Sequence, residues 1–364
     1  MLNHMLQNDK SIPMNVCVRS TPLLLLSLCL TTIFGVQVSR AQSVSTNPVG
    51  YLQETITPSS NGTTRVYSAL SFPLQPVPVF VGLVASTSNN TITLSGSIPS
   101  GLTTGTAPYM VHVESAANSI ATGQSFLITA AGTNYVTVSS PTYTVQSILA
   151  ASDQVAIRPA ETLGGLFGTT NTTVLLQGGA SSGGADVVYL WNGTGYTAYY
   201  YYTSYGWVQD GDASYTIQNN MAIYPDEGVL VGRLSTNTLP ATYAISMGGV
   251  PTNAQTALVN APGLTFVSNP LPVPVTLSQF GFTNAPSWLE GSSAGGSDLV
   301  YLWTGSAWQD YYYYSGYGWV EDGDATFTLQ TNTPIPAGAA ILVRRRNTVA
   351  AANAYIGIPL TYTP

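Results

Sequence analysis

The sequence predicts an all-β protein in which an N-terminal small β-barrel or sandwich is followed by two tandem homologous antiparallel β modules. Three observations predict this architecture. Apolar residues come in short alternating runs broken by Gly, Asn and Pro, as at 91–98, 125–138 and 153–159. Almost nothing after residue 41 repeats at helical spacing. A long stretch of the chain also recurs at a fixed offset.

Residues 1–41 are predicted to be an export signal. Lys10 and Arg19 precede the apolar run TPLLLLSLCLTTIFGV, and Ser39 and Ala41 provide the small residues that precede a cleavage site. The run is about 16 residues long, which is short for a membrane span, and no stop-transfer charges follow it. We expect cleavage after Ala41 and export to the periplasm, the outer surface or the medium. The membrane would then be a partner only through the uncleaved signal.

Residues 42–364 contain six arginines, no lysine and fifteen acidic residues, which gives a net charge of −9. Both cysteines, Cys17 and Cys29, lie in the predicted signal, so the mature chain is expected to lack disulfides and cysteine-based sites. Absence of lysine excludes lysine Schiff bases and phosphate-binding loops of the Gly-Lys-Ser type. The acidic balance, with one basic cluster at Arg344–Arg346, argues against nucleic acid as a partner.

The order of elements predicts three domains. Residues 42–160 contain short strands at roughly ten-residue spacing and form the predicted N-terminal β domain. The chain then repeats itself with an offset of 112 residues, so that Asp186 matches Asp298 and VYLW occurs in both copies. We place the first Tyr-rich module at 161–262 and the second at 263–364.

Each module contains a predicted hairpin and a run of four tyrosines, at 199–202 in the first and 311–314 in the second. Gly193 and Gly305 would supply the positive φ of a two-residue turn. Pairing outward from these turns gives Tyr189 opposite Tyr196 and Tyr301 opposite Trp308. Because side chains alternate along a strand, the tyrosines are shared between two faces. In the first module the predicted core face carries Val188, Leu190, Tyr199 and Tyr201.

The second face is almost entirely aromatic and forms the candidate ligand-binding surface. It packs on a neighbouring module or meets a ligand, such as a sugar ring or another protein, and the sequence leaves both readings open. Its candidate residues are Tyr189, Trp191, Tyr196, Tyr200 and Tyr202 in the first module, and Tyr301, Trp303, Trp308, Tyr312 and Tyr314 in the second.

The motif DGDA occurs in both modules and offers weak calcium candidates. These are Asp210, Asp212, Asp322 and Asp324. Neither copy has the spacing of a known calcium loop, and Asp-Gly is a common turn pair, so a plain turn is favoured. We expect no metal and no cofactor.

Few residues are candidates for catalysis. His112 is the only histidine after residue 41, and it lies in an alternating strand. The carboxylates considered for a glycosidase-like pair are Glu114, Asp153, Glu161 and Glu290, although their spacing does not indicate that they meet. A catalytic residue is therefore not assigned.

Several motifs resemble a family of exported bacterial proteins found especially in the Verrucomicrobia. They are TNPVGY at 46–51, IRP at 157–159 with TLG and LF at 162–167, the strand VLVGR ending at Arg233, and the connector GGVPTNAQT at 248–256. Asn47 stands where aspartate is more usual. The resemblance implies export and a β fold, and it brings no cofactor, established activity or catalytic residues.

These observations favour a non-catalytic exported cell-envelope or extracellular protein with a structural or adhesive role. The alternative is a carbohydrate-binding protein that uses the aromatic faces of the repeated modules. A glycan-active hydrolase is the third hypothesis. The partners expected are polysaccharide or other surface proteins, with self-association also open.

Overall fold

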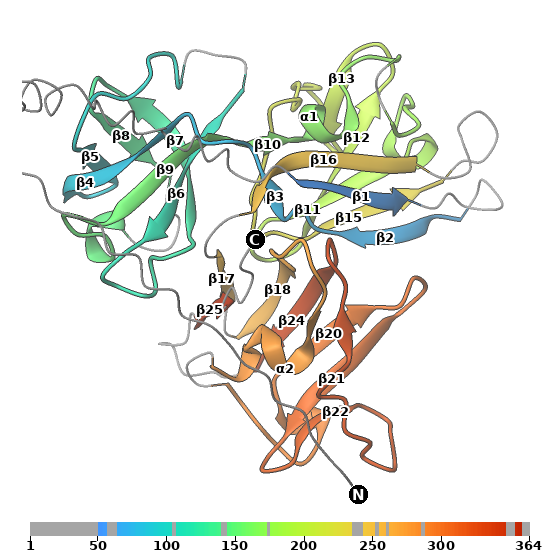
Figure 1. Cartoon of the computed structure of the whole chain (residues 1–364). Helices are drawn as coiled ribbons and strands as arrows, with labels where there is room; N and C mark the ends of the chain where they lie inside the picture. The colour runs from blue at the N-terminus through green and yellow to red at the C-terminus, as the bar shows by residue number, and fades with distance from the viewer. Residues whose placement is uncertain are drawn as a thin grey trace, which may run out of the picture. The chain divides into compact units, whose positions relative to one another are not determined.

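The computed structural model describes residues 50–56, 64–103, 107–139, 144–172, 175–234, 243–251, 255–259, 262–284, 288–346 and 354–358. The predicted all-β class is confirmed, because the described chain is built from antiparallel strands with two short α-helices (Figure 1). The predicted export signal at 1–41 lies outside the described residues. No helix within the described ranges has the length and apolar character needed to cross a membrane.

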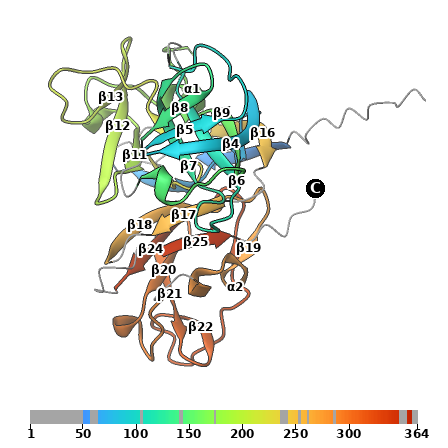
Figure 2. The same ribbon diagram turned by 90° about the vertical axis from the view of Figure 1, so that its left-hand side faces the viewer.

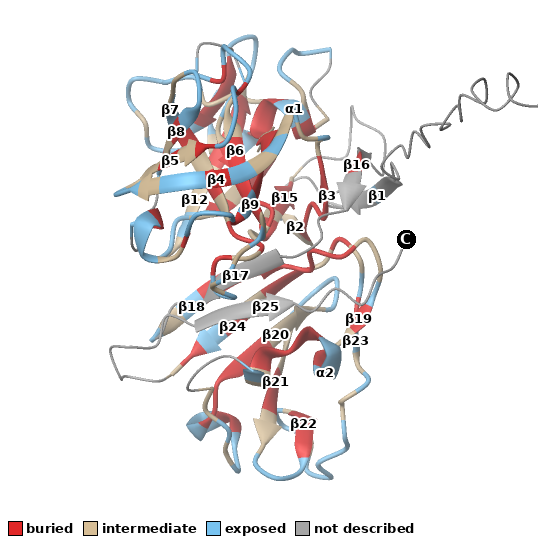
Figure 3. Ribbon diagram, turned by 60° about the vertical axis from the view of Figure 1, so that its left-hand side comes forward, coloured by how far each residue is buried: buried red, intermediate tan, exposed pale blue. Residues whose placement is uncertain are grey.

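Six strands close into a barrel. They are β4 (Phe80–Ser88), β5 (Thr91–Leu94), β6 (Tyr109–Ser115), β7 (Ser125–Ala131), β8 (Tyr135–Val138) and β9 (Gln154–Pro159), in the order β4-β5-β8-β7-β6-β9. A short 3₁₀ turn at Val145–Ser147 precedes β9. Every second side chain of a strand points into the barrel and fills its interior. In β5 these residues are Ile92 and Leu94, which are buried in the barrel core. Figure 3 shows the buried residues of these strands in red.

Each Tyr-rich module contains a five-stranded antiparallel sheet. The first has the order β13-β12-β11-β15-β2 and the second β22-β21-β20-β24-β18 (Figures 1 and 2). The strands of the first are β2 (Val66–Leu70), β11 (Val187–Trp191), β12 (Tyr196–Tyr202), β13 (Gly206–Gln209) and β15 (Val229–Arg233). Those of the second are β18 (Gly263–Ser268), β20 (Leu299–Trp303), β21 (Trp308–Tyr314), β22 (Gly318–Glu321) and β24 (Ala340–Arg345).

Smaller sheets complete each module, and the first module has one strand more than the second in these sheets. In the first module β1 (Gly50–Ile56) and β3 (Leu74–Gln75) pair with β16 (Tyr243–Pro251), and β10 (Glu161–Thr162) pairs with β14 (Ala222–Ile223) before α1 (Leu163–Phe167). In the second, β17 (Gln255–Val259) pairs with β25 (Ala354–Ile358), and β19 (Val275–Thr276) pairs with β23 (Pro334–Ile335) before α2 (Leu277–Phe280). Thr162 and Thr276 cap the two helices through their side chains.

The strand pairing divides the chain differently from the predicted boundaries. We placed β1, β2 and β3 in the N-terminal domain, but β2 pairs with β15 and β1 pairs with β16, so all three belong to the first module. The barrel, residues 80–159, is thus an insertion between β3 and β10 of that module. The second module, residues 255–358, is uninterrupted, and its β17 lies before the predicted boundary at 263.

The two chain connections of the barrel run side by side. The Val79 amide donates to the Ile157 carbonyl at 2.9 Å, and the Arg158 guanidinium donates to the Pro76 carbonyl at 3.0 Å. An inserted domain whose ends lie this close is tolerated by its host, because the host loop closes over the same short distance with or without the insertion.

The predicted core face of the first module is confirmed. Val188, Leu190, Tyr199 and Tyr201 lie in one buried cluster around Trp207, whose side chain is 0 % exposed. The Trp207 indole N–H donates to the Gly168 carbonyl at 2.8 Å, so burial leaves this polar group satisfied.

The hairpin register differs by two residues from the prediction, which leaves the assignment of side chains to the two faces unchanged. Trp191 lies opposite Tyr196 and Trp303 opposite Trp308, whereas Tyr189 lies opposite Ala198 and Tyr301 opposite Asp310. In the first module the reason is the Asn192 side chain, whose Oδ1 accepts the amides of Thr194 and Gly195. With this cap, Asn192 and Gly195 are the residues that close the turn, and the turn lies one residue further along the chain than predicted.

The modules contact each other through equivalent edges. Glu227, just before β15, bridges Val267 of β18, while Ala339, just before β24, bridges Leu70 of β2. Two backbone hydrogen bonds between the modules lie beside these bridges. The Ser268 amide donates to the Asp226 carbonyl at 3.0 Å, and the Ser71 amide donates to the Gly338 carbonyl at 2.7 Å. Each module thus gives the other the same two segments, as in a two-fold symmetric dimer interface.

Candidate functional site

The central tyrosines of the predicted aromatic face are buried inside their own modules. Tyr200 is 5 % and Tyr312 is 3 % exposed. Tyr200 packs with Ala185, Val187 and Val208 in a small second core, to which Tyr189 and Tyr202 contribute partly buried rings. In the second module Tyr312 packs likewise, with Tyr301 and Tyr314 at the margin. These central rings are therefore neither an open platform nor a contact with the neighbouring module.

The cover over Tyr200 is a loop of the same module. Gly179 forms a parallel bridge with Tyr202, and a 3₁₀ turn at Ser182–Gly184 follows. In the second module Gly291 bridges Tyr314 before the turn at Ala294–Gly296. Alternation along a strand does not reveal such a cover, because it says which residues share a face and not what lies over that face.

The aromatic residues at the hairpin ends connect the two modules. Ring centroids lie 5.0 Å apart for Trp191 and Tyr196, 5.6 Å for Tyr196 and Phe266, 5.9 Å for Phe266 and Trp308, and 5.1 Å for Trp308 and Trp303. All four pairs are edge-to-face, the arrangement that aromatic quadrupoles favour. Tyr196 is 37 % exposed, and burial of the rest of its side chain raises its pKa to about 12. The candidates Trp191, Tyr196, Trp303 and Trp308 therefore take part in aromatic packing within and between the modules.

A more exposed aromatic surface lies at the opposite end of the tyrosine strands. In the first module the ring centroid of Tyr202 lies 5.9 Å from that of Tyr205 and 5.2 Å from that of Tyr215. In the second module the ring centroid of Tyr314 lies 5.9 Å from that of Tyr317 and 5.5 Å from that of Phe327. An aliphatic residue follows each loop ring. We call these clusters the aromatic ends; they comprise Tyr202, Tyr205, Tyr215 and Ile217, and Tyr314, Tyr317, Phe327 and Leu329.

Most of each aromatic end is open to solvent. Tyr205, Tyr215 and Ile217 are 49 %, 44 % and 50 % exposed, and Tyr317, Phe327 and Leu329 are 52 %, 42 % and 51 % exposed. Figure 3 shows the loops next to β22 largely in the pale blue of exposed residues. Two matching clusters of aromatic and aliphatic side chains are therefore presented to solvent.

The loop that carries each aromatic end is held in a strained conformation. Tyr215 and Phe327 both have a φ of 51°, in the left-handed region that bulky residues avoid. Such a backbone costs on the order of 1 kcal/mol. Both modules retain an aromatic side chain there, where glycine would be the easier residue. The strain points to a use for the exposed ring.

The second aspartate of each DGDA motif fastens this loop. Asp212 accepts the amides of Ser214 at 2.9 Å and Thr216 at 2.8 Å, and Asp324 accepts those of Thr326 at 2.8 Å and Thr328 at 2.7 Å. These hydrogen bonds lower the pKa of Asp212. The carboxylates are thereby engaged as turn caps.

The other two calcium candidates, Asp210 and Asp322, are exposed at the start of the same turns, and each donates its own amide to a strand carbonyl. Among the described residues no group of three or more His, Cys, Asp or Glu is placed to hold a metal ion. The geometry of both motifs is that of a turn.

Two of the four carboxylates considered for catalysis have structural partners. Glu114 pairs with Arg158 at 2.6 Å, and Asp153 accepts the amides of Ala117 and Ala150. Burial raises the pKa of Glu161, which lies in β10. Glu290 is exposed in the second module. His112 is buried in β6, where its Nδ1 lies 3.0 Å from the Ser125 hydroxyl.

Sequence reasoning assigned no role to two acidic residues at the module contact. Burial raises the pKa of Asp226 to about 6, and burial together with the charge of Asp226 raises that of Glu227 to about 8. Glu227 accepts the Trp191 amide at 2.9 Å. The signal available was their replacement by Gly338 and Ala339 in the second copy, which is a sign of a role specific to one side of the contact.

Comparison of the chain with protein-family models, with curated proteins and with solved structures finds no match.

Proposed function

We propose that the protein is a non-catalytic exported protein that makes adhesive contacts at the cell envelope or outside the cell, and that the aromatic ends are its contact surface. The observation that carries this proposal is the duplication of one exposed aromatic cluster, built around a strained residue, in both modules. An exposed apolar patch kept at a cost in backbone energy is typical of a binding surface.

Polysaccharide is the ligand class that we assign to this surface. Two copies of one small site on one chain suit a polymer that repeats its own units, since the second contact then benefits from a high effective concentration. Phenol rings offer an apolar face to a sugar ring and a hydroxyl group to its polar edge. The carbohydrate-binding hypothesis is thus retained, with the site moved from the centre of the tyrosine strands to their ends.

The roles of four acidic residues support a non-catalytic function. A glycosidase needs two carboxyl groups facing one substrate. Glu114 and Asp153 instead bind Arg158 and backbone amides, and Asp212 and Asp324 cap turns. The carboxylates most fully engaged in the described structure therefore stabilise the fold.

The test is co-sedimentation of the mature protein with a panel of insoluble polysaccharides. Variants remove one aromatic end (Tyr205→Ala with Tyr215→Ala), the other (Tyr317→Ala with Phe327→Ala), or both. Tyr135→Ala is the matched control, because Tyr135 is a 42 % exposed tyrosine on the barrel. We expect each double variant to weaken binding about tenfold and the quadruple variant to abolish it, as multivalent binding requires. Wild-type affinity in the quadruple variant would refute the proposal.

A further inference from the structure

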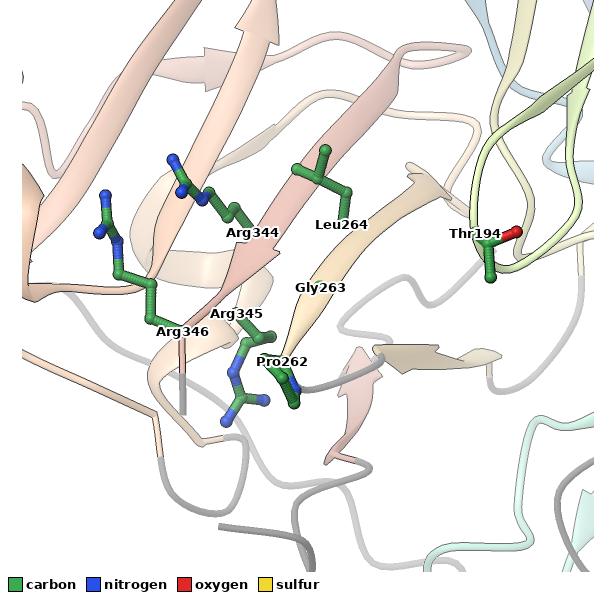
Figure 4. Close-up of a pocket in the computed structure, with 7 residues that line it drawn as sticks. All are labelled: Thr194, Pro262, Gly263, Leu264, Arg344, Arg345 and Arg346. Atoms are coloured by element: carbon green, nitrogen blue, oxygen red, sulfur yellow. The ribbon is translucent and has the colours of Figure 1, made fainter. Parts of the chain in front are cut away.

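A pocket of about 480 Å³ opens beside β18 and the end of β24 (Figure 4). Its lining includes the three consecutive arginines Arg344, Arg345 and Arg346, together with Leu264 of β18 and Thr194 of the first module's hairpin turn. These are half of the six arginines that follow residue 41 in a segment of net charge −9. A concentration of positive charge in such a chain calls for a physical explanation.

Arg345 is explained by the fold. It is 1 % exposed, its Nε donates to Asp298 at 2.7 Å, and its guanidinium lies 5.3 Å from the centre of the Trp288 ring. Figure 4 shows its side chain on the opposite side of β24 from Arg344 and Arg346, as strand alternation requires.

Arg344 and Arg346 are different. Figure 4 shows their side chains projecting to the same side of the strand. Arg344 is exposed, and within the described ranges neither residue takes part in an ion pair. The Nε of Arg346 is buried and has no hydrogen-bond partner among the described residues. A buried donor without an acceptor costs about 1–3 kcal/mol. A ligand acceptor would recover that cost.

The first module shows that the fold does not need this pair. At the offset of 112 residues, Gly232 and Leu234 stand where the second module has Arg344 and Arg346. Arg65 lies over Gly232 and donates to the carbonyls of Ala185 at 2.7 Å and Gly232 at 3.2 Å. The Arg65 guanidinium of the first module therefore binds backbone carbonyl groups of that module. Arg344 and Arg346 of the second module form no ion pair with a carboxylate among the described residues.

We propose that Arg344 and Arg346 bind a carboxylate or sulfate group of an acidic polysaccharide. This inference deepens the proposed function and depends on it for the polymeric nature of the ligand. Guanidinium groups bind planar or tetrahedral oxyanions through paired N–H donors. Leu264, which is 38 % exposed and lies opposite Arg344 in the sheet, provides an apolar neighbour for the sugar ring. The two modules would then differ in specificity, since the second module would bind an anionic group of the polymer through these arginines and the first would not.

The test measures binding of polygalacturonate, dextran sulfate and neutral dextran to the mature protein by calorimetry at several salt concentrations. The variant is Arg344→Gln with Arg346→Gln, and Tyr135→Ala is the control. We expect the variant to lose about tenfold in affinity for at least one acidic polymer, with a shallower salt dependence and unchanged affinity for the neutral one. The two acidic polymers distinguish a carboxylate ligand from a sulfate ligand. Equal affinities of variant and wild type would overturn the proposal.

A second measurement separates this inference from the proposed function. Sodium galacturonate and sodium sulfate are titrated into the ¹⁵N-labelled protein while the arginine Nε–H resonances are followed, with galactose as the neutral control. Shifts confined to Arg344 and Arg346 would support the anion site even if no polymer bound and the proposed function failed. Absence of those shifts would overturn the site, whatever the aromatic ends bind.

Discussion

The Arg345 guanidinium lies 2.7 Å from the Asp298 carboxylate in the interior of the second module, and both side chains are 0 % exposed. Arg233 and Asp186 form the same buried pair at 3.3 Å in the first module. Asp298 also accepts the amides of Leu289 and Arg346, so the carboxylate ties the loop that covers the tyrosines to the end of β24. One pair in each module thus holds the cover over the second core.

Removing either aspartate is predicted to destabilise its module. Asp298→Ala leaves Arg345 buried without its carboxylate, and loss of one partner of a buried pair costs about 3–5 kcal/mol. Asp186→Ala is expected to act similarly in the first module. Chemical denaturation followed by tyrosine and tryptophan fluorescence measures the change. Asp322→Ala, at an exposed site, is the control; a loss below about 1 kcal/mol in the buried variants would contradict the structural role.

Several features of this architecture can be predicted from the sequence, because they depend on the alternation of apolar residues and on the internal repeat. Period-two alternation identifies the strands and assigns Leu190 and Tyr201 to the core face. The fixed offset between copies aligns Asp186 with Asp298. Neither signal reveals that an arginine pairs with each aspartate, because Arg233 and Arg345 lie 47 residues further along the chain in both copies.

The insertion of the barrel was not predictable for a related reason. β2 and β18 occupy equivalent positions at the edges of their sheets, but the intervening barrel breaks the 112-residue offset, and the two strands share little sequence. The aromatic ends were missed because Tyr215 and Phe327 lie in loops, where alternation carries no information. Their signal was an aromatic residue recurring three positions after the DGDA aspartate.

The barrel is predicted to fold without the rest of the chain. Its core is separate from the two module cores, and its ends meet through the bond between Val79 and Ile157. A fragment spanning residues 77–160 should give a cooperative thermal transition and dispersed amide resonances. The reciprocal variant, with 80–159 replaced by a short Gly-Ser linker, should keep the first module folded. An unfolded fragment would show that the barrel depends on its host.

Stability is predicted to fall as the pH rises through the neutral range. The pKa of Glu227 is raised to about 8 and that of Asp226 to about 6, so between their ordinary values and these values the folded protein binds more protons than the unfolded chain. The stabilisation is complete below the ordinary values and is lost as the pH passes about 8. Melting temperatures measured from pH 5 to pH 9 report it.

Glu227→Ala provides the control, because Ala339 occupies the equivalent position in the second module. The variant should fold and should show a flatter decline in melting temperature between pH 6 and pH 9. A decline as steep as that of the wild type would assign the pH dependence to other groups.

Glycine at the strained loop position is predicted to separate stability from binding. Tyr215→Gly relieves a φ of 51° and removes the ring that contacts Tyr202. Since these effects oppose each other, the free energy of unfolding should change by less than about 1 kcal/mol. Binding to polysaccharide should fall in the same variant, and in Phe327→Gly. If Tyr215→Gly or Phe327→Gly gains stability and keeps full affinity, the strained ring has no role in binding.

Hydroxyl-radical footprinting of the mature protein with and without its bound polysaccharide tests the central claim most directly, because it reports the accessibility of individual aromatic side chains. Tyr205, Tyr215, Tyr317 and Phe327 should react readily in the free protein and become protected in the complex. Tyr200 and Tyr312 should react little in either state, and exposed Tyr135 should be unaffected by ligand. Protection at Tyr135, or at none of the four rings of the aromatic ends, would contradict their assignment as the contact surface.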